Sequence, residues 1–168
     1  YNYVEKDEKG HVTKQEVRNY ISIATTRPET MLGDGAVAVH PLDTRYNPIV
    51  GKMCEIPVGP KNTRRMIPII LDSYPDPNFG SGAVKITGAH DANDYHVAKR
   101  AKIPMYRLMD TKGYMRSDGL DYKIETEKSR AFARGGAFNE DEIDRINLVP
   151  DEYRGLDRFE DRKLVIIK

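Results

Sequence analysis

Polar side chains able to bind or activate a substrate cluster between Lys85 and Asp94. Lys85 and Thr87 alternate with apolar residues in a short β-type run, so both side chains should leave an extended strand on the same face. Asp91 and Asp94 follow at the spacing of a helix start, where the helix dipole favours ionised carboxylates. A cation, a hydroxyl and two carboxylates would therefore meet at one strand-to-helix junction, an arrangement suited to a small zwitterionic ligand.

The same residues also fit other roles. Asp-x-x-Asp is an ordinary helix start, so the two acids could serve only as caps. His90 and His96 would add metal ligands, but the expected helix begins between His90 and Asp94, and no H-E-x-x-H or cysteine pattern accompanies them. No G-x-S-x-G elbow is present for a serine nucleophile. We therefore expect neither a metal nor a cofactor, and expect His90 to orient the turn.

A second polar cluster follows a predicted strand that ends near residue 24. Its members are Thr25, Thr26, Arg27, Pro28, Glu29 and Thr30. Proline cannot continue a central strand, so the threonine hydroxyls and the arginine gather at a strand end. Taken alone, the run is also typical of a short helical turn with proline at an early helical position.

Short strands separated by turn residues must position these clusters. We predict an initial hairpin, a strand buried on both faces, further short strands, and two helices. The hairpin is expected over 1–5 and 17–24, and the buried strand over 36–39. The further strands are expected over 66–71, 83–87 and 103–108. One helix should begin at 91, and another should lie around 140–148. This spacing favours a small barrel or sandwich over βαβ repeats. We therefore predict an α+β fold centred on a β-barrel, with a few peripheral helices.

Length and composition indicate one domain. The 168 residues, 39% of them hydrophobic, are enough for one sizeable core. Residues 110–152 are polar and interrupted by glycines, which predicts a peripheral insertion within that domain. A net charge of +1 gives no general attraction to nucleic acid, so any RNA contact must be local. The single cysteine, Cys54, and the lack of a signal or spanning segment predict a cytoplasmic location and no membrane partner.

Two segments carry a family resemblance. TTRPETMLGDGAVAVHP (25–41) and GSGAVKITGAHDANDY (80–95) closely resemble the editing domain inserted into valyl-tRNA synthetases, in the same order. Isoleucyl and leucyl enzymes share the architecture, but GAVKIT followed by AHDANDY is most similar to the valyl branch. YRGLDRFEDRK (153–163) is similar to the family's exit segment. With no initiator methionine and no H-I-G-H or K-M-S-K-S motif, the chain is expected to be a piece of a larger class I synthetase.

The resemblance implies particular roles for these residues. Asp94 would hold the α-ammonium of the substrate, while Lys85, Thr87 and Asp91 would recognise or orient the threonine hydroxyl and the attacking water. The remaining implied binding residues, which hold the terminal adenosine and ester carbonyl or shape the pocket, are Thr25, Thr26, Arg27, Glu29, Thr30, Phe79 and His90. Gly88 and Ala92 depart from the family pattern, which commonly has proline and a larger residue there.

The implied activity is hydrolysis of threonine from mischarged tRNA(Val). The implied partners are the acceptor end of tRNA(Val) carrying threonine and the rest of the synthetase in cis, with the protein acting as a monomer. Two alternatives stay open: an editing domain of the isoleucyl branch, and a non-catalytic RNA-binding β-barrel. The second is less favoured, because the aromatic residues are scattered rather than interleaved with a basic stripe.

Overall fold

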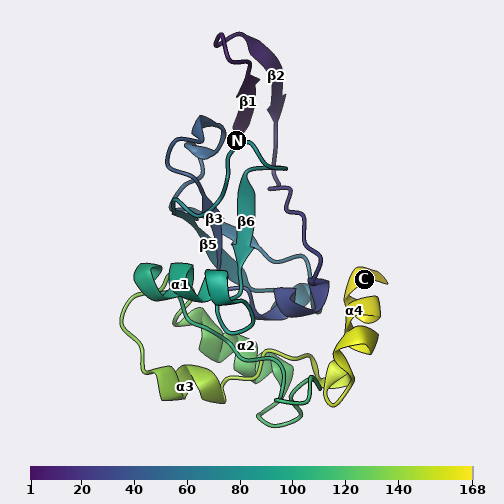
Figure 1. Ribbon diagram of the computed structural model, residues 1–168. Helices are drawn as coiled ribbons and strands as arrows, with labels where there is room; N and C mark the ends of the chain where they lie inside the picture. The colour runs from purple at the N-terminus through teal and green to yellow at the C-terminus, as the bar shows by residue number, and fades with distance from the viewer. Residues whose placement is uncertain (168) are drawn as a thin grey trace.

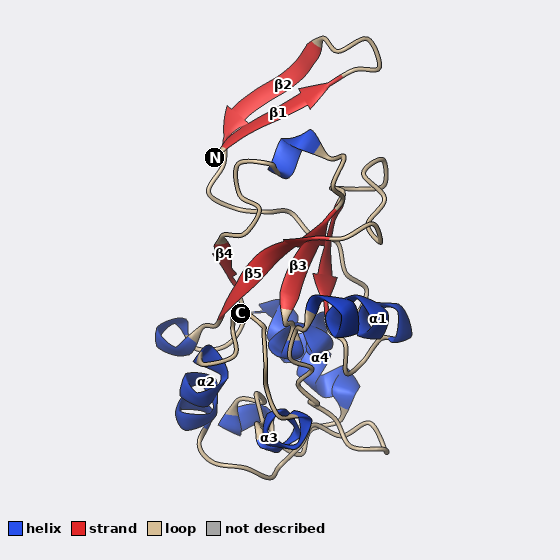
Figure 2. Ribbon diagram, turned by 90° about the vertical axis from the view of Figure 1, so that its left-hand side faces the viewer, coloured by secondary structure: helices blue, strands red, loops and turns tan. Residues whose placement is uncertain are grey.

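The computed structural model describes residues 1–167, whose strands form two open sheets (Figures 1 and 2). The larger sheet has the order β4–β5–β3–β6, with β3 (Ala36–Val39), β4 (Met53–Glu55), β5 (Met66–Leu71) and β6 (Ala83–Ile86). β3 pairs in parallel with β5 and antiparallel with β6. The mixed α/β character is confirmed, but the predicted barrel is not, because β4 and β6 are sheet edges and the described strands do not close.

β3 is the central strand, and it is buried on both faces as its unbroken apolar sequence predicts. Ala36 and Ala38 face Val97 and Ala98 of α1 (Ala92–Ala101), which covers that side of the sheet. Val37 and Val39 face the opposite core. Val37 pairs directly with Lys85, so the Lys85 side chain leaves β6 on the face away from α1.

The hairpin of β1 (Asn2–Lys6) and β2 (Val12–Val17) projects from one end of the molecule (Figure 1). The prediction of a second strand over 17–24 was wrong: β2 ends at Val17, and residues 18–27 form no strand. Asp7 accepts hydrogen bonds from the backbone N–H groups of Lys9 and His11, which closes the turn early. Pairing therefore begins at Val12, in a strand that is mostly exposed.

The helices gather at the other end of the molecule (Figure 2). They are α2 (Tyr122–Arg130), α3 (Glu140–Arg145) and α4 (Arg158–Ile167), of which the sequence predicted only α3, with a longer span. Segment 110–152 contributes Met115, Ile143 and Leu148 to a core that also contains Leu32. α4 packs against η1, a 3₁₀ helix over Pro28–Gly33. None of the helices within residues 1–167 has both the length and the apolar character required to cross a membrane.

The expected strand over 103–108 was also wrong. These residues are largely buried but belong to no ladder, and they run directly over the turn before β3. A Cβ at Gly35 would lie 2.5 Å from Ile103 Cγ2 and 2.8 Å from the carbonyl oxygen of Pro104. Only glycine allows the two backbone segments to approach so closely. The apolar pattern of 103–108 thus reflects burial against this turn rather than strand pairing.

Candidate functional site

Lys85 is the centre of a polar network on the sheet face away from α1. Its Nζ donates to Thr30 Oγ1 at 3.0 Å, to Thr87 Oγ1 at 2.5 Å and to Asp34 Oδ1 at 3.2 Å. The Thr87 hydroxyl in turn donates to Asp34 Oδ1. Lys85 and Thr87 therefore do share a face, as strand alternation predicts, and Thr30 of the first motif reaches them from η1.

Asp34 is the residue of this network that sequence reasoning missed. Its side chain is 4% exposed and lies between Gly33 and Gly35, in the turn pressed against segment 103–106. Burial raises the pKa of Asp34 to about 6, although the nearby Lys85 ammonium opposes the shift. An acid between two glycines, directly before a wholly apolar strand, was the sequence signal available for it.

Asp91 and Asp94 have separate tasks at the start of α1. Asp91 is the N-cap and accepts from the N–H groups of Asn93 at 2.8 Å and Asp94 at 3.1 Å, which confirms the predicted cap. Asp94 is 6% exposed and accepts from the backbone N–H of Thr87 at 2.9 Å. Burial, with a smaller contribution from the Asp91 charge, raises the pKa of Asp94. Asp94 is thus a buried carboxylate that is not needed as the cap.

Arg27 and His90 join the two polar motifs. The Arg27 guanidinium donates through Nη1 to the backbone oxygen of His90 at 2.6 Å. The His90 ring accepts through Nε2 from the backbone N–H of Leu108 at 2.8 Å, which fixes its orientation. Burial and the Arg27 charge lower the pKa of His90 to about 4, so the ring is neutral at physiological pH. A neutral, fixed ring can shape a pocket without adding charge to it.

Glu29 pairs with α4 rather than with the polar network around Lys85. Its side chain is 1% exposed, and its two oxygens accept from Arg162 Nε and Nη2, each at 2.8 Å. Arg27 Nε lies 3.7 Å from Glu29 Oε1. Glu29 therefore connects the first motif to α4, a contact that sequence reasoning did not foresee.

Two further predicted residues lie apart from the network. Thr26 is exposed, and Phe79 is 81% exposed in the loop before β6. Thr25 accepts through Oγ1 from the backbone N–H of Arg27 at 3.1 Å and faces a cavity. The structure thus brings together Thr30, Lys85, Thr87 and Asp94, and leaves Phe79 outside the group.

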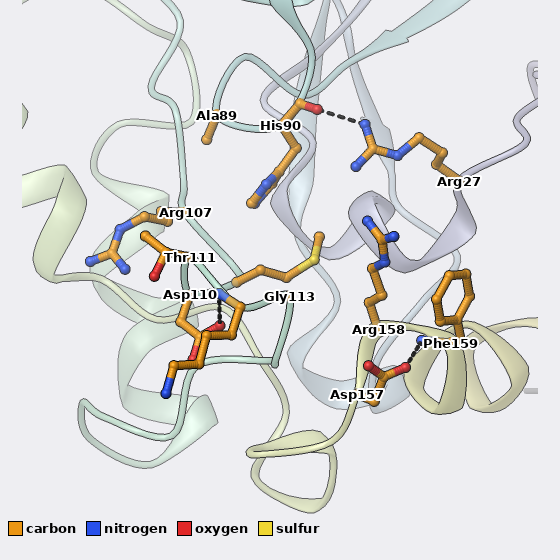
Figure 3. A pocket seen from close by; sticks show the side chains of 12 residues that line it. Arg27, Ala89, His90, Arg107, Asp110, Thr111, Gly113, Asp157, Arg158 and Phe159 are labelled. Atoms are coloured by element: carbon orange, nitrogen blue, oxygen red, sulfur yellow. Dashed lines mark hydrogen bonds between the residues drawn. The ribbon is translucent and has the colours of Figure 1, made fainter.

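Two cavities lie near the predicted site residues. The larger, about 750 Å³, lies between segment 18–25 and the sheet, and has Thr25, Asp34 and Lys85 in an otherwise largely apolar lining. The smaller, about 610 Å³, is bordered by Arg27 and His90 themselves (Figure 3). Volumes of this size suit small ligands or single nucleotides. Within residues 1–167, no three His, Cys, Asp or Glu side chains come together as a set of metal ligands.

Comparison with known proteins gives a consistent family. No protein-family model matches the chain. It is 72% identical over 166 residues to a valine–tRNA ligase from Ruegeria pomeroyi, covering 99% of this chain and 16% of that protein. It is 43% identical over 160 residues to a valine–tRNA ligase from Rhizobium meliloti, covering 95% of this chain and 15% of that protein. It is 37% identical over 171 residues to a valine–tRNA ligase from Xylella fastidiosa, covering 99% of this chain and 17% of that protein.

These relatives belong to one class, the aminoacyl-tRNA synthetases, and nearly the whole chain is similar to one segment of them. Each of them is a valine–tRNA ligase, and the chain spans about 16% of the length of the relative with 72% identity. A solved structure described as GlLeuRS-CP1 shares 16% sequence identity with a TM-score of 0.38, over 49% of this chain and 47% of that one.

Proposed function

We propose that this segment hydrolyses threonine from mischarged tRNA(Val) after transfer, so that it edits the product of a valine–tRNA ligase. The observation that carries the proposal is the hydrogen-bonded group of Lys85, Thr87 and Asp94 at the junction of β6 and α1, joined by Asp34. The chemical need is clear. An apolar pocket that accepts valine cannot strongly reject an isostere with an added hydroxyl, and valine against threonine is itself the usual example of this limit.

The substrate amino acid needs an anionic and a hydrogen-bonding partner. The charged α-ammonium would pair with Asp94, whose raised pKa would fall again once a cation lies beside it. Lys85, Thr87 and Asp91 would orient the threonine hydroxyl and the attacking water. Because Lys85 is already held by Thr30 and Asp34, it acts from a fixed position. A methyl group in place of the threonine hydroxyl would leave these polar partners unsatisfied, which disfavours valine.

The reaction is ester hydrolysis. The water oxygen forms a bond to the ester carbonyl carbon, the bond from that carbon to the ribose oxygen breaks, and the ribose oxygen takes up a proton. Arg27 and the neighbouring threonines would hold the terminal adenosine and stabilise the developing charge on the carbonyl oxygen. The vicinal ribose hydroxyl would assist. An activated ester held next to a positioned water gains most of its acceleration from orientation.

The direct test is deacylation by the 168-residue chain of threonyl-tRNA(Val) and valyl-tRNA(Val), each corrected for spontaneous hydrolysis. We expect threonyl-tRNA to be hydrolysed and valyl-tRNA to be spared. Binding of tRNA with no release of either amino acid would contradict the proposal and favour a non-catalytic RNA-binding module. EDTA should leave the rate unchanged, because Asp91 and Asp34 already use their carboxylates on backbone N–H groups, Lys85 and Thr87. Loss of activity in EDTA that zinc or manganese restores would instead indicate a metallohydrolase.

A further inference from the structure

Arg65 is a buried cation that the proposed reaction does not use. It directly precedes β5 and is 7% exposed. An arginine keeps its proton in proteins, so a full positive charge lies inside the domain. Among the described residues, the acid whose charge acts on Arg65 is Asp34, but Asp34 forms its salt bridge with Lys85. A buried charge that is not directly paired is costly, so the contacts of this guanidinium need an explanation.

The guanidinium of Arg65 binds the backbone on both sides of Gly33. Its Nη2 donates to the carbonyl oxygen of Leu32 and, at 2.9 Å, to that of Asp34. The group also lies 5.2 Å from the centre of the Tyr106 ring, where a cation–π interaction offsets part of the cost of burying the charge. One nitrogen therefore holds two carbonyl groups of the turn that carries Asp34.

This turn is held from the strands on both sides of β3. Arg65 reaches it from the start of β5. From the other side, the carbonyl oxygen of Ile86, at the end of β6, accepts from the backbone N–H of Gly35 at 2.9 Å. Asp34 lies between two glycines, which restrain the backbone less than any other residue. The position of the Asp34 carboxylate therefore depends on contacts from outside the turn, and Arg65 supplies those from the β5 side.

Arg65 also acts on the charge of Asp34. Burial raises the pKa of Asp34 to about 6, while the charges of Lys85 on β6 and, less strongly, Arg65 oppose the shift. Cys54 on β4 is close enough for the Asp34 charge to act on it. Burial raises the pKa of this thiol to about 11, so it is neutral near pH 6. Removal of the Arg65 charge should therefore move the pKa of Asp34 upwards.

We propose that Arg65 positions the polar network around Lys85: it fixes the turn that carries Asp34, so that this carboxylate holds the ammonium and hydroxyl groups of the network in place. The inference rests on the proposed function for the reaction that the network serves. Arg65 would act on the rate only through Asp34, without contacting the substrate. Arginine suits this role better than lysine, because its planar group reaches two carbonyls while it lies against Tyr106.

The first test compares Arg65→Lys with Arg65→Met in deacylation of threonyl-tRNA(Val) by the 168-residue chain. Arg65→Lys should lower kcat by about tenfold with KM unchanged, because a small misplacement of an orienting group slows the reaction without weakening binding. Its rate should still rise with pH through about 6, since the charge is kept. Arg65→Met should lower kcat further and move this rise to higher pH, because removal of the cation raises the pKa of Asp34.

The matched control is Arg116→Met. Arg116 is 5% exposed, and its Nη1 donates to the backbone carbonyl oxygens of Arg107 at 3.0 Å and Asp144 at 2.8 Å, which are not part of the polar network. The control should lose stability as Arg65→Met does and keep the kcat and pH profile of the parent. Melting temperatures set an assay temperature at which every variant is folded. Arg65→Lys provides the test if Arg65→Met does not fold.

A double-mutant cycle with Asp34→Asn shows whether Arg65 acts through Asp34. In the Asp34→Asn background, Arg65→Lys should lower kcat by less than about twofold, because the carboxylate that Arg65 positions is no longer present. Each of four results would overturn the inference: parent kcat in both Arg65 variants, an equal loss of kcat in Arg116→Met, a pH profile that does not move in Arg65→Met, or the full loss repeated in the Asp34→Asn background.

Hydrogen exchange at the Gly35 amide separates this inference from the proposed function, because it requires no reaction. Relative to the amides of β3, Gly35 should exchange about tenfold faster in Arg65→Lys, the effect of losing roughly one hydrogen bond that holds the turn, and at the parent rate in Arg116→Met. If the parent deacylates no tRNA while Gly35 exchange still rises in Arg65→Lys, the proposed function fails and Arg65 still fixes the Asp34 turn. Unchanged Gly35 exchange in Arg65→Lys would overturn the inference at any level of activity.

Discussion

The backbone N–H of Thr87 donates to Asp94 Oδ2 at 2.9 Å, so the residue that follows β6 is tied directly to the first turn of α1. Asp91 alone caps the helix. Asp94 is therefore held in place by Thr87 and does not serve as the helix cap. The structure thus assigns the cap to Asp91 and leaves Asp94 free of that role, whereas the Asp-x-x-Asp spacing in the sequence was compatible with both acids serving only as caps.

Removing the Asp94 charge should abolish most editing while preserving the fold. A cation in a partly desolvated pocket loses about 2–5 kcal/mol when its anionic partner is removed, so Asp94→Ala should slow deacylation of threonyl-tRNA by some tens to thousands of times. Asp94→Asn is the matched control, because its amide oxygen can still accept from Thr87 and only the charge is lost. Deacylation rate and melting temperature are measured on the same preparations. An Asp94→Asn protein that works at the parent rate would exclude the ammonium-binding role.

Asp34 should give the reaction a pH dependence. Its pKa is raised to about 6 by burial, so its carboxyl is largely neutral at pH 5 and largely ionised at pH 7. The ionised form holds the Lys85 ammonium and the Thr87 hydroxyl more strongly. We therefore expect the rate to rise with pH through about 6, beyond the rise in spontaneous hydrolysis. Asp34→Asn should lower the rate and remove this limb of the profile.

The control for this profile is Glu8→Gln in the hairpin turn, an exposed acid far from the network. It should leave the profile as in the parent protein. An Asp34→Asn profile that kept the limb near pH 6 would assign that titration to another group, and Asp34 would then have only a structural role.

Local patterns predicted the elements that depend on local interactions. The start of α1 follows from Asp91 as an N-cap, and the shared face of Lys85 and Thr87 follows from strand alternation. The burial of β3 on both faces follows from its unbroken apolar sequence. Each of these features is set by contacts within a few residues, which is the range over which periodicity carries information.

The features that were missed depend on contacts distant in sequence. Asp34 meets Lys85 and Thr87 across 51 and 53 residues, so no local pattern marks it as their partner. Glu29 meets Arg162 across 133 residues. β2 is mostly exposed and polar, which removes the alternation that identifies a half-buried strand. Segment 103–108 is buried against the turn at Gly35 without pairing with any strand. In the sequence, its apolar pattern could not be distinguished from that of a strand.

Asp161 should make the protein more stable at low pH. It is fully buried on α4, neither oxygen has a hydrogen-bond partner within the described residues, and burial with the nearby Glu29 charge raises its pKa to about 7. The ordinary pKa of an aspartate is 3.8, so between pH 3.8 and about 7 the folded state keeps a proton that the unfolded state has lost. The free energy of unfolding therefore falls as the pH rises through that window. At about 1.4 kcal/mol for each pKa unit, the loss is at most about 4 kcal/mol above pH 7.

The variant Asp161→Asn removes this titration. At pH 8 the variant should be more stable than the parent protein. The gain should be smaller than the stability that the parent loses on ionisation of Asp161, because the buried amide also lacks hydrogen-bond partners. Near pH 4 the two proteins should be equally stable. Urea unfolding at several pH values measures it. A parent protein whose stability stays flat between pH 4 and pH 7, relative to the variant, would show that the Asp161 pKa is not raised.

The pair of Glu29 and Arg162 should contribute strongly to the attachment of α4. Arg162→Met would leave the Glu29 carboxylate buried without its bidentate partner, a loss of about 2–3 kcal/mol in the free energy of unfolding. The cost stays below that of a wholly unpaired buried charge because Arg27 Nε lies 3.7 Å away. Arg158→Met, one turn earlier on α4, is the control. Its guanidinium has no carboxylate partner in residues 1–167, so the change should cost less than about 0.5 kcal/mol. Urea unfolding of both variants decides the question: equal losses would mean that α4 is held by apolar contacts such as those of Val165, and that the ion pair contributes little.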